Sequence, residues 1–415
     1  GLNFDGEPVI QSSRLGDYRE IAHQLIASGS AYRCFCTPER LETLRRNQQT
    51  QKLAPRYDKH CLRLSAISAQ KLAAADTPYV VRLAVPTHGT ITFTDLIHGI
   101  VPIKAEILDD QVLMKSDGYP TYHLAAVVDD HDAGITHVIR GEEWLPSTPK
   151  HLLLYHALGW TPPAFAHLPL LLNADRSKLS KRTGDVAVDD YRQAGYLPSA
   201  LVNFIVLLGW NPGSDQEIFN LSELITQFSL ERVKRSGAVF DQKKLDWING
   251  YYLRQMDISA FTELAAPWLK TTPPPINSGH ENFLRRVLAL EQSRIRKLSD
   301  LPRAVDYFFH RPELEVKLVP WKQQTPFAAA KILQTLAQNL ASAPNFVADE
   351  IKLRIQRFIA EHAVTTGEVL WPMRVALTGR QASPDPIDIA AVLGKEETLA
   401  RLAAAVQVLT LAPHP

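Results

Sequence analysis

The chain has 415 residues, of which 45% are hydrophobic and 21% are charged, and its formal net charge is +1. This length exceeds one ordinary core, so we expect two to four domains. The near-neutral balance excludes nucleic-acid binding through overall charge and leaves only local basic patches for it. No uncharged apolar stretch is long enough for a bilayer span, and the first residues, GLNFDGEP, lack the pattern of a signal peptide. Three cysteines argue against a disulfide framework, so we expect a protein of the reducing cytoplasm that binds no membrane.

The N-terminal third is predicted to combine helices with short strands. In SRLGDYREIAHQLIASG, apolar residues recur at helical spacing and Gly29 is a natural terminator. A basic helical stretch runs from Pro38 to about Lys52. From about Thr77 to Met114, the β-branched runs YVVRLAV, GTITFTD, GIVPIKA and QVLMKS are broken by turns, which predicts an antiparallel meander.

The middle of the chain is predicted to form a parallel α/β unit. YPTYHLAAVVDD has the pattern of a helix and THVIRG that of a short buried strand. Residues 147–149 then cap the helix KHLLLYHAL, which ends at Gly159, and the apolar run HLPLLLN follows. Helix, strand, helix and strand in this order form a parallel unit, with the meander inserted ahead of it.

Beyond residue 185 the chain is predicted to be almost entirely helical. LPSALVNFIVLLGW is an apolar helix, and TTPPPINSGHEN (271–282) is the best linker because three consecutive prolines cannot continue a helix. The remaining residues alternate Ala/Leu-rich helices with short turns, as in a helical bundle.

The stretch SKLSKR (177–182) places Lys178, Lys181 and Arg182 around Ser180, directly after the second predicted strand of the parallel unit. Such cations repel one another, so the stretch is either a solvated basic turn or a loop that binds a polyanion. Ligands of open parallel sheets bind at the carboxyl ends of the strands, which favours a phosphate-binding loop.

This loop is similar to the Lys-Met-Ser-Lys-Ser signature of class I aminoacyl-tRNA synthetases, in the form typical of glutamyl-tRNA synthetases. The stretches SDGYPTYHLAAVVDDHDAGITHVIRGEEWLPSTPKHLLLYHALGW and AVFDQKKLDWINGYYLR also resemble that family, in the same order. The resemblance covers essentially the whole chain. It implies ATP-dependent attachment of L-glutamate to tRNA(Glu) through a glutamyl-adenylate, with Mg²⁺ arriving with the ATP, by a monomeric enzyme.

The implied fold class is α/β plus all-α, in five segments. An incomplete Rossmann-type nucleotide-binding domain would comprise residues 1–28 and 122–184, interrupted by an α+β acceptor-stem-binding domain at 29–121. A helical stem-contact domain would follow at 185–257, and a helical anticodon-binding domain at 258–415.

The resemblance also implies roles for single residues in the phosphate loop. Lys178 and Lys181 would neutralise the ATP phosphates as pyrophosphate leaves, Lys181 also binding ATP, and the Ser180 hydroxyl would serve the backbone or a phosphate. Arg182 either contacts ATP or is solvated.

Two further sets of residues match the family's substrate pockets. Tyr122 and Arg140 match the glutamate pocket, although Arg140 has a structural alternative in pairing with Glu142 or Glu143. Glu143, Leu170 and Leu171 match ATP-binding positions. The family usually has Asn four residues after the pocket tyrosine, whereas this chain has Ala126, which weakens the amino-acid assignment more than the reaction class.

Two clusters carry metal-ligand chemistry. Asp129, Asp130, His131 and Asp132 are consecutive on a predicted helix and point in different directions, so we expect a polar helix end rather than a metal site. Cys34, Cys36 and Cys61 are all the cysteines of the chain, and nearby thiolates in a reducing compartment indicate zinc. The resemblance implies Tyr57 as the fourth ligand, with His60 as another option; the alternative is three unligated thiols.

The family's second phosphate-binding signature, of the His-Ile-Gly-His type, does not occur in these residues. We therefore expect a family member lacking roughly ninety N-terminal residues, either a fragment of an intact enzyme or a truncated paralogue. The alternative function is a tRNA-binding module without catalysis. The glutaminyl relative is disfavoured because its anticodon-binding part is a β-barrel, whereas residues 258–415 have a helical pattern.

Basic residues, with one tryptophan, cluster locally in this last segment: Arg285, Arg286, Arg294, Arg296, Lys297, Lys352, Arg354, Arg357, Trp371 and Arg374. Any single arginine of these clusters is expected to lie on a solvated helix face, whereas the position in the chain and the family resemblance together favour contact of the clusters with the anticodon arm.

Overall fold

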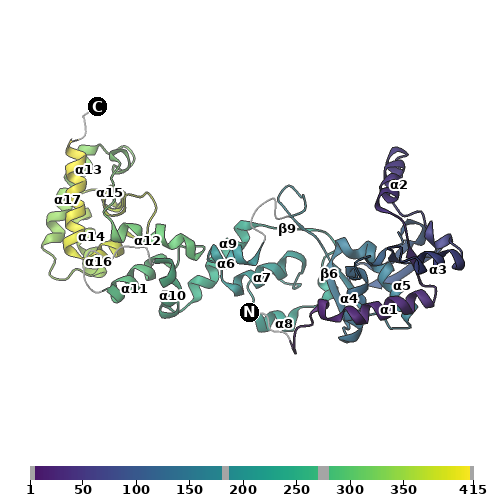
Figure 1. Cartoon of the computed structure of the whole chain (residues 1–415). Coiled ribbons are helices and arrows are strands. Elements are labelled where there is room, and N and C mark those ends of the chain that lie inside the picture. The colour runs from purple at the N-terminus through teal and green to yellow at the C-terminus, as the bar shows by residue number, and fades with distance from the viewer. Residues whose placement is uncertain (1–4, 180–186, 270–279, 412–415) are drawn as a thin grey trace. The chain divides into compact units, whose positions relative to one another are not determined.

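The computed structural model describes residues 5–179, 187–269 and 280–411 (Figure 1). It divides into two compact units. The first comprises Gly1–Leu179 with Ile205–Phe240, and the second comprises Ser180–Phe204 with Asp241–Pro415. These units do not follow the five segments expected from the sequence, whose boundaries stay a prediction. No helix of the described residues is long and apolar enough to cross a membrane.

The first unit contains a three-stranded sheet and a four-stranded sheet. In the three-stranded sheet, β2 (Val80–Leu83) lies between β1 (Ala31–Cys34) and β5 (Val112–Met114), and both pairings are antiparallel. The four-stranded sheet has the order β4-β3-β7-β6, with bounds Gly99–Lys104, Thr90–Asp95, Ala164–Leu168 and His137–Gly141.

The predicted single meander is therefore wrong. Strands β3 and β4 form an antiparallel hairpin, but β3 then pairs in parallel with β7 rather than with β2. The physical reason is burial, because Phe93 of the hairpin packs edge-on against Phe165 of β7, with ring centroids 6.4 Å apart. The hairpin thus joins the sheet of the parallel unit.

The parallel α/β unit is confirmed. Helix α4 (Tyr122–Asp132) leads to β6, and η4 (Glu142–Ser147) and α5 (Thr148–Leu158) connect β6 to the parallel strand β7. Helix α5 ends at Gly159, whose φ of 71° is the left-handed conformation that glycine adopts without strain. The side chain of Ser147 makes no capping bond, so that expected cap is wrong.

The apolar run HLPLLLN does not form one strand. Strand β7 ends at Leu168, and Leu171–Leu172 form the separate strand β8, which pairs in parallel with β9 (Ala238–Val239). Strand β9, which follows η5 (Leu230–Arg232), is a two-residue exception to the expected, almost entirely helical character beyond residue 185. The remaining elements of the first unit are η1 (Gln11–Arg14), α1 (Leu15–Ala27), α2 (Pro38–Thr50), η2 (Cys61–Arg63), α3 (Ala66–Ala74), η3 (Ala105–Ile107) and α8 (Leu221–Gln227).

One hydrophobic core joins α1 to both sheets. Tyr18 of α1, Leu83 of β2, Leu124 of α4 and Phe165 of β7 are buried in this core. The hydroxyl of Tyr18 donates to Asp129 at 2.8 Å. Helix α1 is therefore fixed to α4 by both apolar and polar contacts.

The polar end of α4 points in several directions, as its helical spacing predicts. Asp129 accepts hydrogen bonds from Tyr18 and Arg14, while His131 stacks on Trp160 with ring centroids 3.8 Å apart. Asp132 pairs with Arg14. Asp129 and Asp132 therefore bind Arg14 of η1, whereas His131 packs against Trp160.

All the secondary-structure elements described in the second unit are helices, as predicted. Its helices are α6 (Val188–Gln193), α9 (Gln242–Gln255), α10 (Ile258–Ala265), α11 (His280–Glu291), α12 (Leu301–Phe309), α13 (Pro326–Ala341), α14 (Ala348–His362), α15 (Thr366–Thr378), α16 (Pro386–Leu393) and α17 (Lys395–Leu411), with η6 (Ala266–Leu269), η7 (Leu298–Asp300) and η8 (Val316–Leu318). Helix α7 (Pro198–Gly209) begins in this unit and ends in the first. Most of the predicted linker, residues 271–279, lies outside the described residues.

Polar contacts connect α9 to two other parts of the second unit. Asn249 is fully buried, accepts from the Leu197 backbone at 2.8 Å and donates to the Arg296 carbonyl. A Cβ on Gly195 would lie 2.7 Å from the Leu298 backbone nitrogen, so only glycine fits there. These contacts join residues on both sides of residue 258, so the second unit is not divided at the boundary expected there.

Candidate active site and metal centre

Arg140 lies near the end of β6 and is held by acceptors without charge. Its Nε donates to His167 Nε2 at 3.1 Å, and one terminal nitrogen donates to Thr148 Oγ1 at 3.0 Å. The other lies 3.4 Å from the hydroxyl of Tyr122. No carboxylate of the described residues forms an ion pair with Arg140, although Asp130 lies near enough to interact with its charge.

The structural alternative for Arg140 is wrong within the described part of the chain. Glu143 pairs with Lys178 at 3.3 Å, and a carboxylate oxygen of Glu142 accepts from the Leu170 backbone at 3.4 Å. Both carboxylates therefore have other partners.

Tyr122 is the first residue of α4 and forms an aromatic wall beside Arg140. It is 46% exposed, and its ring centroid lies 4.5 Å from that of Trp144 and 6.0 Å from that of His151. Ala126 lies one turn further along the same helix. The two residues expected in one pocket, Tyr122 and Arg140, are thus brought together.

Several polar residues around Arg140 were not expected from the sequence. His167 donates from Nδ1 to Asp95 at 2.6 Å, and both side chains are fully buried. His151 lies 3.0 Å from His123, ring nitrogen to ring nitrogen. The sequence carried one signal for this arrangement, namely that His167 lies within an apolar strand pattern. A polar group buried in such a strand needs a hydrogen-bond partner.

The three histidines are held neutral. Burial lowers the pKa of His123 to about 4, with the charges of Lys150 and Arg140 adding to the effect. Burial also places the pKa of His151 well below its ordinary value. For His167, burial lowers the pKa and outweighs the opposing hydrogen bond to Asp95. Arg140 is therefore the cation of this cluster at neutral pH.

Lys178 lies on a tight hairpin. Leu179 donates its backbone N–H to the Leu171 carbonyl at 2.8 Å, and Asn173 donates to the Ser177 carbonyl at 2.8 Å. The Leu170 carbonyl accepts from the Ala238 backbone at 3.0 Å. The backbone of Leu170 and of Leu171, the first residue of β8, is thus held by hydrogen bonds to neighbouring segments. Ser180, Lys181 and Arg182 lie outside the described residues.

Glu143 lies close to the hairpin, where the Lys178 ammonium reaches it. The backbone lowers the pKa of Glu143 most, and Lys178 adds to this against a small effect of burial. The Glu143 carboxylate occupies the space that a Cβ on Gly141 would need. A glycine at residue 141 therefore makes room for this ion pair.

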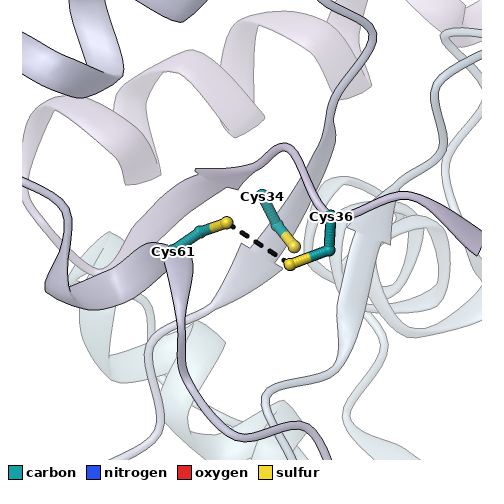
Figure 2. A group of neighbouring side chains, drawn as sticks. All are labelled: Cys34, Cys36 and Cys61. Atoms are coloured by element: carbon teal, nitrogen blue, oxygen red, sulfur yellow. Dashed lines mark hydrogen bonds between the residues drawn. The ribbon is translucent and has the colours of Figure 1, made fainter. Parts of the chain in front are cut away.

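The three cysteines come together, although β1, the following loop and η2 supply them separately (Figure 2). The Sγ atoms of Cys36 and Cys61 are 3.5 Å apart, and all three sulfur atoms lie within 4.8 Å of one another. The Tyr57 hydroxyl lies 3.4 Å from Cys34 Sγ and 3.3 Å from Cys36 Sγ. His60 does not belong to the group of ligand atoms that the described residues form.

This donor set fits a zinc ion. A tetrahedral site with ordinary zinc–sulfur distances has sulfur–sulfur edges of roughly 3.8 Å, close to the separation observed. Cations lie nearby, with Arg40 3.4 Å from Cys36 Sγ and the Arg82 guanidinium 4.2 Å from the ring centroid of Tyr57. Burial raises the pKa of Cys34, but hydrogen bonds from Tyr57 and Arg82 outweigh it and lower the pKa. For Cys36, burial prevails and raises the pKa to about 12.

Five of the clustered residues make contacts inside the second unit. Arg286, Arg354 and Arg374 donate to backbone carbonyls of Ala391, Asn339 and Ser383. Arg294 lies 3.5 Å from Glu291, and the Trp371 indole donates to the Leu318 carbonyl. Which of the clustered residues contact tRNA stays a prediction. The side chains of Arg285, Lys352 and Arg357 are exposed.

Comparisons with known proteins agree with one another. Residues 1–247 match the family described as tRNA synthetases class I (E and Q), catalytic domain, and residues 260–406 match an anticodon binding domain. A glutamate–tRNA ligase of Clostridium botulinum is 40% identical over 398 residues, which are 95% of this chain and 81% of the relative. That of Chlorobium luteolum is 39% identical over 99% of this chain and 84% of the relative. The crystal structure of a glutamate tRNA ligase from Elizabethkingia meningosepticum in complex with its amino acid has a TM-score of 0.85 at 33% identity, covering 97% of this chain and 85% of that one.

Proposed function

We propose that this chain acts in the ATP-dependent attachment of L-glutamate to tRNA(Glu), because it belongs to the family of class I tRNA synthetases for glutamate and glutamine. A carboxylate oxygen of glutamate attacks the α-phosphate of ATP, and pyrophosphate leaves. A ribose hydroxyl of the tRNA then attacks the glutamyl carbonyl, and AMP leaves. We expect the enzyme to act as a monomer in the cytoplasm.

The observation that carries this proposal is the environment of Arg140. Its guanidinium is oriented by His167, Thr148 and Tyr122, and none of these neutralises its charge. An oriented arginine in such a pocket pairs strongly with a carboxylate, because the desolvated charges attract one another and the donors need not reorganise. Arg140 and Tyr122 therefore bind the carboxylate end of the amino acid.

The ATP-binding residues surround the Lys178 hairpin. Glu143, Leu170 and Leu171 hold the nucleotide, while Lys178, Ser180 and Lys181 stabilise charge on the phosphates as pyrophosphate leaves. The ion pair of Lys178 and Glu143 is exposed, so it contributes little and the ammonium can turn to a phosphate at small cost. Mg²⁺ enters with ATP and is held mainly by its phosphates.

The cysteine cluster has a structural role in this proposal. Cys34, Cys36, Cys61 and Tyr57 would hold one zinc ion, which supplies a crosslink between β1 and the 57–61 loop. It takes no part in the chemistry at ATP.

The five segments receive the following roles. Residues 1–28 and 122–184 bind ATP and glutamate, and residues 29–121 bind the acceptor stem. Residues 185–257 contact the tRNA stem, and residues 258–415 read the anticodon, with the exposed Arg285, Lys352 and Arg357 available to its phosphates.

The deciding experiment is glutamate-dependent exchange of pyrophosphate into ATP by the full-length gene product, followed by aminoacylation of purified tRNA(Glu). Lys181→Ala should slow the exchange by roughly a hundredfold to a thousandfold, the scale for losing one preorganised charge contact. Arg296→Ala, which changes a basic residue of the second unit, is the matched control and should leave exchange unchanged. Binding of tRNA without any exchange by the wild-type protein would instead support a non-catalytic tRNA-binding protein.

A further inference from the structure

The buried pair Asp95 and His167 connects the end of β3 to the proposed glutamate pocket. We propose that this pair is a positioning device, in which Asp95 sets the tautomer of His167 so that its Nε2 accepts from Arg140 and orients the guanidinium for the substrate carboxylate. This inference rests on the role of Arg140 in the proposed function.

The geometry determines which ring nitrogen carries the hydrogen. His167 Nδ1 lies 2.6 Å from Asp95 Oδ2, and a carboxylate only accepts, so Nδ1 is the donor. Arg140 Nε lies 3.1 Å from His167 Nε2 and only donates, so Nε2 carries the lone pair. Thr148 Oγ1 lies 3.1 Å from the same nitrogen.

Asp95 has a second task that a suitable substitution preserves. Its Oδ1 accepts from the backbone nitrogens of Ile97 at 2.9 Å and His98 at 2.8 Å. These bonds hold the turn between β3 and β4. Burial would raise the pKa of Asp95, but the bonds from His167, His98 and Ile97 lower it, so the carboxylate is ionised.

Asp95→Asn separates the two tasks. The amide oxygen takes the place of Oδ1, because two backbone donors need an acceptor there. The amide nitrogen then faces His167 Nδ1 and donates to it, which moves the ring hydrogen to Nε2. An N–H of His167 would then oppose the N–H of Arg140, and the guanidinium would turn away.

The experiment compares Asp95→Asn, His167→Gln and the double variant in the full-length protein. We expect Asp95→Asn to raise KM for glutamate by about tenfold or more, the scale of one buried donor left unpaired, with KM for ATP unchanged. His167→Gln keeps an acceptor facing Arg140 and should cost less. The double variant should resemble His167→Gln alone, because without the imidazole Asp95 has no tautomer to set.

A spectroscopic measurement tests the pair independently of catalysis. Two-bond nitrogen–proton correlations of histidine-labelled protein at pH 7 should show His167 protonated at Nδ1 in the wild type and at Nε2 in Asp95→Asn. His137→Gln, an exposed histidine on β6, assigns one background signal and should leave both kinetic constants unchanged.

Each contrary outcome has its own meaning. A wild-type KM for glutamate in Asp95→Asn, or an Nε2–H tautomer in the wild type, overturns the positioning role. Equal rises in the KM values for glutamate and ATP, together with a lowered melting temperature, would show that Asp95 and His167 have a purely structural role. That result would also overturn the positioning role. If Arg140→Gln leaves KM for glutamate unchanged, the substrate role in the proposed function fails instead.

Discussion

The Arg140 pocket and the cysteine cluster differ in how they accommodate reactive polar groups. Around Arg140, uncharged acceptors from β7, α4 and α5 orient the cation. In the cysteine cluster, three thiols and a phenol face one another, with contacts of 3.3–3.5 Å that are weak as hydrogen bonds. One site is therefore oriented by contacts within the protein, whereas the other brings together groups whose mutual contacts are weak.

The largest expected effect tests the Arg140 pocket. Arg140→Gln should raise KM for glutamate by roughly a hundredfold, because a desolvated carboxylate would lose its charge partner. KM for ATP and the zinc content should stay the same. Pyrophosphate exchange at varied glutamate measures this effect, and an equal loss of zinc would show that the two sites are not separate.

The second-largest expected effect is a loss of folding stability in acid, caused by the histidines around Arg140. His123, His151 and His167 have lowered pKa values, so below about pH 6.5 the unfolded chain binds protons that the folded chain does not. Their contribution to stability is complete above that pH and is lost as the pH falls below it. For His123 the loss continues down to its pKa in the folded state, which is about 4.

Urea unfolding between pH 7.5 and 4.5 measures this loss, on the order of a few kcal/mol. The measurement uses a Cys61→Ser background, so that release of bound zinc in acid does not contribute. His123→Gln should flatten the profile, whereas the exposed His137→Gln should not. A flat wild-type profile would mean that the histidines are not held neutral.

A smaller effect tests the cysteine cluster. We expect one zinc per chain in the wild type and almost none in Cys61→Ser, with a melting temperature lower by several degrees. A chelator should lower the melting temperature of the wild type to that of the variant and leave the variant unchanged. KM for glutamate should not respond, in contrast to Arg140→Gln.

The same metal analysis decides the fourth ligand. Tyr57→Phe should weaken zinc binding, because its hydroxyl lies among the sulfur atoms. His60→Ala is the matched control and should keep the metal. If His60→Ala loses the zinc and Tyr57→Phe keeps it, then His60 and not Tyr57 is the fourth ligand.

The smallest expected effect on stability concerns Lys178. Lys178→Ala removes an exposed ion pair and should change the free energy of unfolding by less than about 1 kcal/mol. KM for ATP should nevertheless rise, since the ammonium faces the phosphates in the proposed complex. A matched substitution, Lys115→Ala, removes the exposed pair with Asp117 and should alter neither quantity.

Much of the molecule could be predicted where local pattern decides it. The helical second unit follows from apolar spacing, and the parallel pairing of β6 with β7 follows from the strand–helix–strand order. The cysteine cluster could be predicted as well, because few residue types bind zinc and the chain has no other thiols. Residues Tyr122 and Arg140 were found through family resemblance rather than through spacing.

Tertiary structure alone decided the partners of Arg140. Asp95 and His167 are 72 residues apart, and they meet because β3 leaves its expected meander and pairs with β7. Local periodicity says which face of a strand is apolar, but not which distant strand will cover it. That choice depends on the free energy of burying complementary surfaces, here Phe93 against Phe165, and it exists only once the whole unit has folded.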